Sequence, residues 1–149
     1  MTMPAFRDSA TTTAPPEEVW KILYDPGRFP EWWTGVGSVE TAAADGSRTP
    51  YTMYPDGYPD FPMPQVLESS RDDRTVSVSC LVSDLRFAWR LEPAGAGTRI
   101  AVEVEIPEAE AHRLDGQREA IASALRRLAA VAAADAPLTP PSGGPPPRP

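Results

Sequence analysis

The spacing of apolar and polar residues changes along the chain, and it is clearest in the second half. Three successive segments, 74–82, 84–93 and 97–107, place apolar residues at every second position. The apolar sets are Val76, Val78, Cys80 and Val82; Leu85, Phe87, Trp89 and Leu91; and Ile100, Val102, Val104 and Ile106. A period of two is typical of a strand with one buried face, and short turns between such strands favour antiparallel pairing. We therefore predict a three-stranded meander with Glu103 and Glu105 on its solvated face.

The stretch that follows, 108–134, changes to a helical period. It is rich in alanine, glutamate, leucine and arginine, which are good helix formers. Its apolar stripe consists of Leu114, Ile121, Leu125, Leu128 and Ala132. Gly116 weakens the early part of this helix and is a candidate for a kink. The pattern predicts one long C-terminal helix that packs on the sheet.

The N-terminal part predicts a strand and two short helices. Residues 5–14 are rich in threonine, which suits a strand. A helix starts in "APPEEVWKILYD", because proline is favoured in a first turn and Glu17 and Glu18 lie near the positive end of the helix. Pro26 ends it. The aromatic segment 27–33 predicts a second short helix, with tryptophans that anchor it in the core.

Three more strand signals, 36–43, 48–54 and 64–70, complete the order of elements. The fold class is therefore α+β, with a curved antiparallel sheet of about seven strands around a long C-terminal helix, in the order β-α-α-β6-α. Residues 1–135 form one domain. The segment 136–149, "APLTPPSGGPPPRP", has almost nothing to bury, and we expect a disordered proline-rich tail.

This order, together with the segments 14–40 and 87–106 and the long helix, resembles the START-like (SRPBCC) superfamily, also called the helix-grip fold. The likeness is to its polyketide cyclase/dehydrase and lipid-transport branch. The resemblance implies a hydrophobic cavity between the sheet and the long helix. It also implies that the segment 51–64 borders the mouth of that cavity.

The segment 51–64, "YTMYPDGYPDFPMP", combines large apolar side chains with four prolines. Asp56-Gly57 is a strong turn signal, and prolines stiffen a loop. A stiff aromatic rim orders a ligand at low entropic cost. The residues expected to contact a ligand are Tyr51, Met53, Tyr58, Phe61, Val66, Val78, Phe87, Trp89, Val102 and Val104.

Composition excludes several classes of function. The net charge of −7 and the lack of a basic stripe argue against nucleic acid and anionic membranes as partners. Cys80 and His112 are the only residues of their types, so we predict no metal site and no cofactor. The first ten residues lack a signal-peptide pattern, and no stretch approaches a membrane span. We expect no membrane insertion and a cytoplasmic location; the sequence leaves the oligomeric state open.

Two residues are weak candidates for acid–base catalysis. Glu68 shares its strand parity with Val66, so it faces a cavity if that row points inward, and solvent if a bulge intervenes. His112, at the start of the long helix, is a candidate proton shuttle, but we favour its interpretation as a surface residue on an exposed helix start. Tyr51 and Tyr54 are candidate hydrogen-bond donors to an enolate.

Three functions remain open from the sequence. The first is the binding of a hydrophobic small molecule, aromatic, polyketide-like or lipid-like, in an internal cavity. The alternative is an enzyme of the polyketide cyclase/dehydrase type, and the sequence leaves catalysis undecided. The second alternative is a protein-interaction module, which predicts a filled core.

The tail prediction is tested by truncation. Ending the chain after Ala136 removes seven prolines and almost no apolar surface. The melting temperature and ligand binding should therefore not change. Thermal unfolding of the full-length and truncated proteins checks this, and a large loss of stability would mean that the tail docks on the domain.

Overall fold

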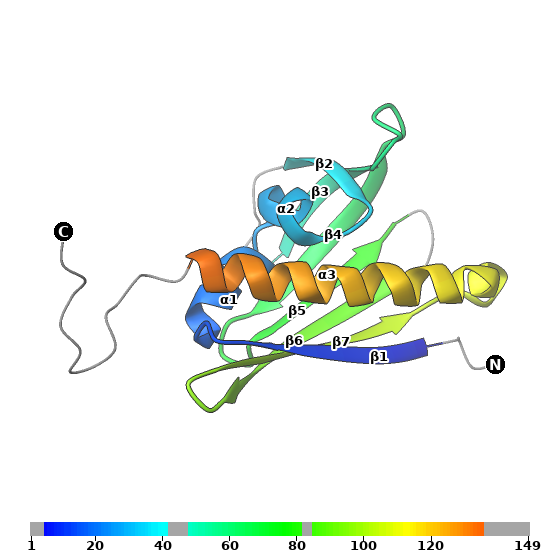
Figure 1. The fold of residues 1–149 in the computed structure, drawn as a ribbon. Helices are drawn as coiled ribbons and strands as arrows, with labels where there is room; N and C mark the ends of the chain where they lie inside the picture. Colours follow the sequence, from blue (N-terminus) through cyan, green and yellow to red (C-terminus); the bar gives the residue numbers. More distant parts are fainter. Residues whose placement is uncertain (1–4, 42–47, 82–84, 136–149) are drawn as a thin grey trace.

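The computed structural model describes residues 5–41, 48–81 and 85–135, which form a seven-stranded antiparallel sheet and a long C-terminal helix (Figure 1). The strands are β1 (Ala5–Thr12), β2 (Val36–Thr41), β3 (Arg48–Pro55), β4 (Met63–Ser70), β5 (Thr75–Cys80), β6 (Arg86–Ala94) and β7 (Gly97–Glu105). The helices are α1 (Pro16–Leu23), α2 (Phe29–Trp32) and α3 (Leu114–Asp135), with 3-10 turns η1 (Pro26–Arg28) and η2 (Glu108–Arg113). The α+β class and the predicted order of elements are confirmed. The predicted tail 136–149 lies outside the described residues.

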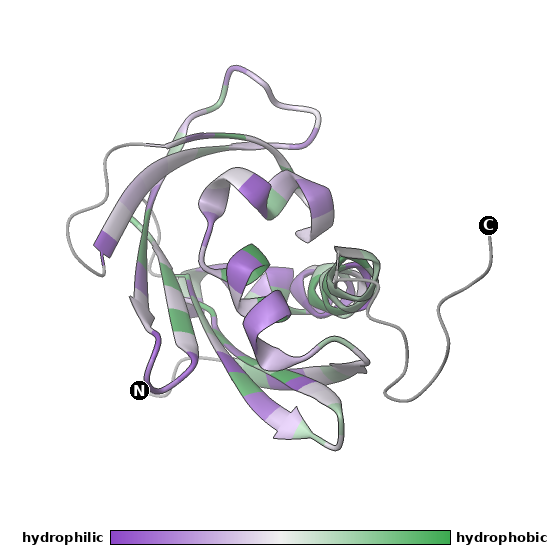
Figure 2. Ribbon diagram, turned by 90° about the vertical axis from the view of Figure 1, so that its left-hand side faces the viewer, coloured by the Kyte–Doolittle hydropathy of each residue, from purple (hydrophilic) through white to green (hydrophobic). Residues whose placement is uncertain are grey.

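The sheet follows the chain from β2 to β7 and then places β1 beside β7, in the order β1-β7-β6-β5-β4-β3-β2. All neighbouring strands are antiparallel. Figure 2 looks along α3 and shows the sheet curving around the helices. We call the face toward the helices the inner face. The sheet and α3 therefore enclose the interior of the molecule between them.

The strand register confirms the predicted alternation. Val78 pairs with Phe87, and Phe87 pairs with Val104, so these three side chains share one face. All three are buried. Glu103 pairs with Ala88 and Arg7 on the opposite, outer face, as the period of two predicts.

The two N-terminal helices fill the interior from one side. In α1, Pro16 lies in the first turn, and the buried side chains are Val19, Trp20, Ile22 and Leu23. In α2 and just after it, Trp32 and Trp33 are buried, which confirms their predicted role as core anchors. Helix α2 is held to α3 by a hydrogen bond from the Thr34 hydroxyl to the Ser123 hydroxyl (2.8 Å).

The long helix begins later than its composition predicts. Residues 108–113 form the 3-10 turn η2, in which Glu110 leaves helical geometry (φ −112°, ψ 17°). The irregularity therefore precedes Gly116, which lies within α3. The buried side chains of α3 are Ile121, Ala124, Leu125, Leu128 and Ala132. In the described part of the chain, no helix is both long and apolar enough to span a membrane.

Two threonine hydrogen bonds and one close backbone approach join β1, β7 and α3. The Thr98 hydroxyl donates to the Ala14 carbonyl (2.8 Å), and the Thr12 hydroxyl donates to the Ala129 carbonyl (2.9 Å). At Gly97, an added Cβ would lie 2.0 Å from the Thr12 carbonyl oxygen. The close approach of β7 to the end of β1 is therefore possible only because residue 97 has no side chain.

This contact generates a paired prediction. Gly97→Ala should lower the free energy of unfolding by about 2 kcal/mol or more, because two rigid backbone segments must move apart. Gly116→Ala is the matched control: nothing lies within 4 Å of its Cβ position, and alanine favours a helix. It should stabilise the protein by about 0.5–1 kcal/mol. Urea unfolding checks both values, and a neutral Gly97→Ala variant would contradict the close contact.

Candidate functional site

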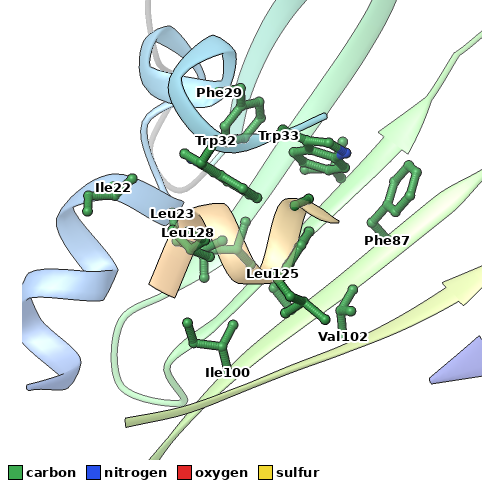
Figure 3. Close-up of a cluster of buried hydrophobic side chains, with 14 of the residues drawn as sticks. Ile22, Leu23, Phe29, Trp32, Trp33, Phe87, Ile100, Val102, Leu125 and Leu128 are labelled. Atoms are coloured by element: carbon green, nitrogen blue, oxygen red, sulfur yellow. The ribbon is translucent and has the colours of Figure 1, made fainter. Parts of the chain in front are cut away.

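Aromatic side chains form a continuous cluster between α2 and the inner face of the sheet (Figure 3). Trp33 meets Phe87 of β6 at 4.8 Å between ring centroids, and it meets Trp89 at 5.2 Å. Trp32 lies edge-on to Trp89 at 5.2 Å. Phe29 connects this group to Tyr51 of β3, at 5.6 Å. Edge-to-face contacts of this kind stabilise a core beyond the area that they bury.

Three residues with polar side-chain atoms form one row across the inner face. Gln65 of β4 pairs with Tyr51 of β3 on one side and with Cys80 of β5 on the other. The Tyr51 hydroxyl donates a hydrogen bond to Gln65 Oε1, with 2.6 Å between the oxygens. Burial raises the pKa of the Tyr51 hydroxyl, and the Cys80 thiol adds to the shift. The hydroxyl is therefore neutral and remains a donor at physiological pH.

Two indole groups in the cluster lack a hydrogen-bond acceptor. Among the described residues, Trp32 Nε1 and Trp89 Nε1 are buried and have no partner. Nearly all buried N–H groups in folded proteins are paired, and leaving one unpaired costs about 1–3 kcal/mol. The interior therefore holds more donors than its own acceptors satisfy.

The interior is most accessible at the end where β3 joins β4. Trp33, Phe87 and Gln65 retain exposed fractions of 7%, 6% and 6%, whereas Trp32 and Phe29 are fully covered. We call this region the hairpin end. Solvent and small molecules therefore have their nearest approach to the aromatic cluster there.

Exposed apolar side chains lie at the same end of the sheet. Tyr58 and Phe61, between β3 and β4, are 65% and 58% exposed, and Leu81, directly after β5, is 58% exposed. The Leu81 N–H donates to the Pro64 carbonyl (3.0 Å), which holds Leu81 beside the start of β4. We call Tyr58, Phe61 and Leu81 the rim.

Comparisons with known proteins agree with this architecture. Residues 3–133 match the family described as "Polyketide cyclase / dehydrase and lipid transport". The chain belongs to this family. The match confirms the resemblance seen in the sequence, and the family's description includes both enzymes and carriers.

Solved structures confirm the fold of this family member. The Zhui aromatase/cyclase from Streptomyces sp. R1128 is 15% identical, with a TM-score of 0.76 over 90% of this chain and 99% of that chain. The protein TTHA0849 from Thermus thermophilus is 20% identical, with a TM-score of 0.71 over 88% and 98%. Ms6760 from Mycobacterium smegmatis is 22% identical, with a TM-score of 0.62 over 87% and 91%. No curated protein sequence matches the chain significantly.

Most residues expected to contact a ligand share the inner face or the rim. On the inner face the register brings together Tyr51, Met53, Val78, Phe87, Trp89, Val102 and Val104. Tyr58 and Phe61 lie on the rim. Val66 pairs with Pro50 and Ser79 on the outer face. The expectation that Val66 faces the interior is therefore corrected.

Neither candidate for acid–base catalysis enters the interior. Glu68 is exposed on the outer face, where it pairs with Arg48 and Ser77. Of the two orientations left open for Glu68, the structure has the one toward solvent, and it does so without a bulge, since the whole Val66 row points outward. His112 is exposed in η2. The Tyr54 hydroxyl donates to the Glu40 carboxylate and is not part of the inner row.

A separate groove of about 750 Å³ lies on the outer face, over β1, β5, β6 and β7. Its floor includes the small side chains of Ala88 and Ala101. Charges along it pair with one another, as in the ion pair of Arg99 with Glu92 (2.9 Å). This is the solvated face that the alternating strands predict. Among the described residues, no cluster of histidine, cysteine, aspartate or glutamate could hold a metal ion.

Sequence reasoning missed Gln65. In "MPQVLESS" two adjacent apolar residues, Val66 and Leu67, make the inward row ambiguous, and a shift of one residue exchanges the two faces. If Met63 and Leu67 are taken as the inward residues, Gln65 between them is a polar side chain in an apolar row. Such a position is a signal for a buried hydrogen bond.

The exposure of the rim predicts a contrast between two identical substitutions. Phe61→Ala should change the free energy of unfolding by less than about 1 kcal/mol, because an exposed side chain loses few contacts. Phe29→Ala removes a fully buried ring and should cost about 3–5 kcal/mol. Chemical unfolding of both variants checks this. A Phe61→Ala variant as unstable as Phe29→Ala would show that the rim is part of the core.

Proposed function

We propose that this protein binds a hydrophobic, aromatic small molecule between the inner face of the sheet and α3, and that the molecule enters at the hairpin end. The observation that carries this proposal is the continuity of exposed and buried aromatic surface. The rim residues follow β3 and β5, whose inner-face residues Tyr51 and Cys80 lie in one row, and within the cluster Trp33 and Phe87 keep the largest exposed fractions, 7% and 6%. Apolar pockets with a few placed polar groups are the usual form of a small-molecule site.

The energetic reason for this assignment is the exposure of the rim. Exposed phenylalanine, tyrosine and leucine side chains lose hydrophobic stabilisation of about 25 cal/mol for each Å² left in water. Clustered apolar residues at one edge of a monomer commonly mark a binding site. A ligand bound between the rim and the cluster would cover part of this apolar surface. The hydrophobic effect that stabilises the core would therefore also favour binding.

Binding without turnover is favoured over the cyclase alternative. A general acid or base must reach the reacting atoms, and Glu68 and His112 are both exposed away from the cluster. The ionisable side chains buried among the described residues are Tyr51 and Cys80. The likeness to the Zhui aromatase/cyclase supports the cyclase alternative, in which the Tyr51 hydroxyl would exchange its hydrogen bond to Gln65 for one to an enolate oxygen.

A neutral fluorescent probe tests the binding site. Nile red should bind saturably, at about one molecule per chain. Tyr58→Ala and Phe61→Ala should each weaken its affinity about fivefold, which corresponds to about 1 kcal/mol of lost apolar contact. Arg90→Ala, in the outer groove, is the control and should leave the affinity unchanged. Fluorescence titration of the four proteins measures these values.

Two outcomes would contradict the proposal. The absence of saturable binding would leave the aromatic cluster as an ordinary core. Weaker binding in Arg90→Ala, with normal binding in both rim variants, would move the site to the outer face.

A further inference from the structure

The interior of the molecule contains polar groups but no buried charge. Among the described residues, the buried polar side chains are Gln65 and Thr98, and no aspartate, glutamate, lysine or arginine is buried. The Thr98 hydroxyl is occupied by its hydrogen bond to Ala14, at the far side of the fold. Gln65 is therefore the polar residue of the interior that remains available to a ligand.

Gln65 is held in a defined orientation. The Tyr51 hydroxyl donates to its Oε1 atom at 2.6 Å, and both residues are buried on the same row of the inner face. Because the Tyr51 hydroxyl already donates to Oε1, the group of Gln65 left for a ligand is the side-chain NH₂, which is a hydrogen-bond donor. Among the described residues, no group accepts a hydrogen bond from this nitrogen. The amide lies at the hairpin end, where the interior is accessible.

The unpaired groups of the aromatic cluster are donors as well. Trp32 Nε1 and Trp89 Nε1 are donors without an acceptor. The ring faces around them are weaker acceptors than oxygen. Two buried donors therefore lack an acceptor within the described chain, and the Gln65 amide nitrogen, which is not among these enclosed atoms, is the donor that a ligand can reach.

We propose that the ligand of the site described above is an uncharged molecule with an acceptor oxygen, such as an aromatic ketone or quinone, and that the Gln65 amide donates to this oxygen. Tyr51 is a positioning residue, because it fixes the amide through Oε1. This inference rests on the proposed function and narrows the class of ligand.

Charged ligands fit the same interior poorly. A carboxylate moved from water into an apolar site loses its hydration, and burying such a charge without a partner is strongly unfavourable. No buried cation is present to compensate it among the described residues. A cationic ligand would meet donors that repel it. The interior therefore selects neutral acceptors over fatty acids and amines.

Matched probes of two sizes test this inference in the full-length protein. The bicyclic set is tetralin, 1-tetralone and tetralin-1-carboxylate, and the tricyclic set is fluorene, 9-fluorenone and fluorene-9-carboxylate. Within each set the members differ in a hydrogen, a ketone or a carboxylate. Equilibrium dialysis measures each dissociation constant for the wild type and for Gln65→Leu, which keeps the apolar volume and removes the amide.

The ratio of ketone affinity to hydrocarbon affinity is the measured quantity, because it cancels changes in overall packing. This ratio should fall about tenfold in Gln65→Leu, as expected for one hydrogen bond. Tyr51→Phe should lower it about threefold while hydrocarbon affinity stays within about twofold, since the amide remains but loses its orientation. A purely structural role of Tyr51 would weaken ketone and hydrocarbon equally and leave the ratio unchanged.

The outcomes separate this inference from the proposed function. If hydrocarbons bind and the ratio is the same in Gln65→Leu as in the wild type, the site exists and the assignment of Gln65 is wrong. If a carboxylate binds as tightly as its ketone, the choice of a neutral ligand is wrong. If no member of either set binds, the proposed function fails and this inference fails with it.

Discussion

The spacing between the sheet and α3 depends on the short helix α2. Trp32 and Trp33 reach from α2 to Trp89 and Phe87 of the sheet. On its other side, α2 is joined to α3 through Thr34 and Ser123. Flat, rigid rings therefore fill the space between α3 and strand β6, whereas β1 meets α3 directly through the hydrogen bond from Thr12 to the Ala129 carbonyl.

The elements of this fold could be predicted because their patterns are regular. Strands β5 to β7 alternate without interruption, and the stripe on α3 repeats at helical spacing. Strand β4 could not be oriented in the same way, since Val66 and Leu67 are equally apolar. Its face is decided by pairing with β3 and β5, which is long-range information. Taking the Val66 row as the inward one left the direction of Glu68 open and concealed Gln65.

The candidate site differs from the sequence expectation in its chemistry more than in its place. The aromatic residues expected around a ligand do gather on one face. The acidic and basic side chains of the described residues, however, stay outside, and the interior polarity comes from an amide, a neutral phenol and two indoles. Unpaired donors are invisible to sequence patterns, because nothing in the sequence shows whether an indole N–H meets an acceptor. Only the three-dimensional packing shows which indole N–H groups lack an acceptor.

The contact among Trp32, Trp33 and Trp89 has an optical consequence. These are three of the four tryptophans in the chain, and each pair lies 5.2 Å apart between ring centroids. Indole transitions at this separation couple electronically, so their near-ultraviolet circular dichroism belongs to the group and not to single residues. The sign and size of such a coupled band depend on the angles between the rings. A tilt of Trp33 alone would change the coupled circular dichroism band of all three indoles. The near-ultraviolet spectrum of the unmodified protein therefore reports on the packing of its interior.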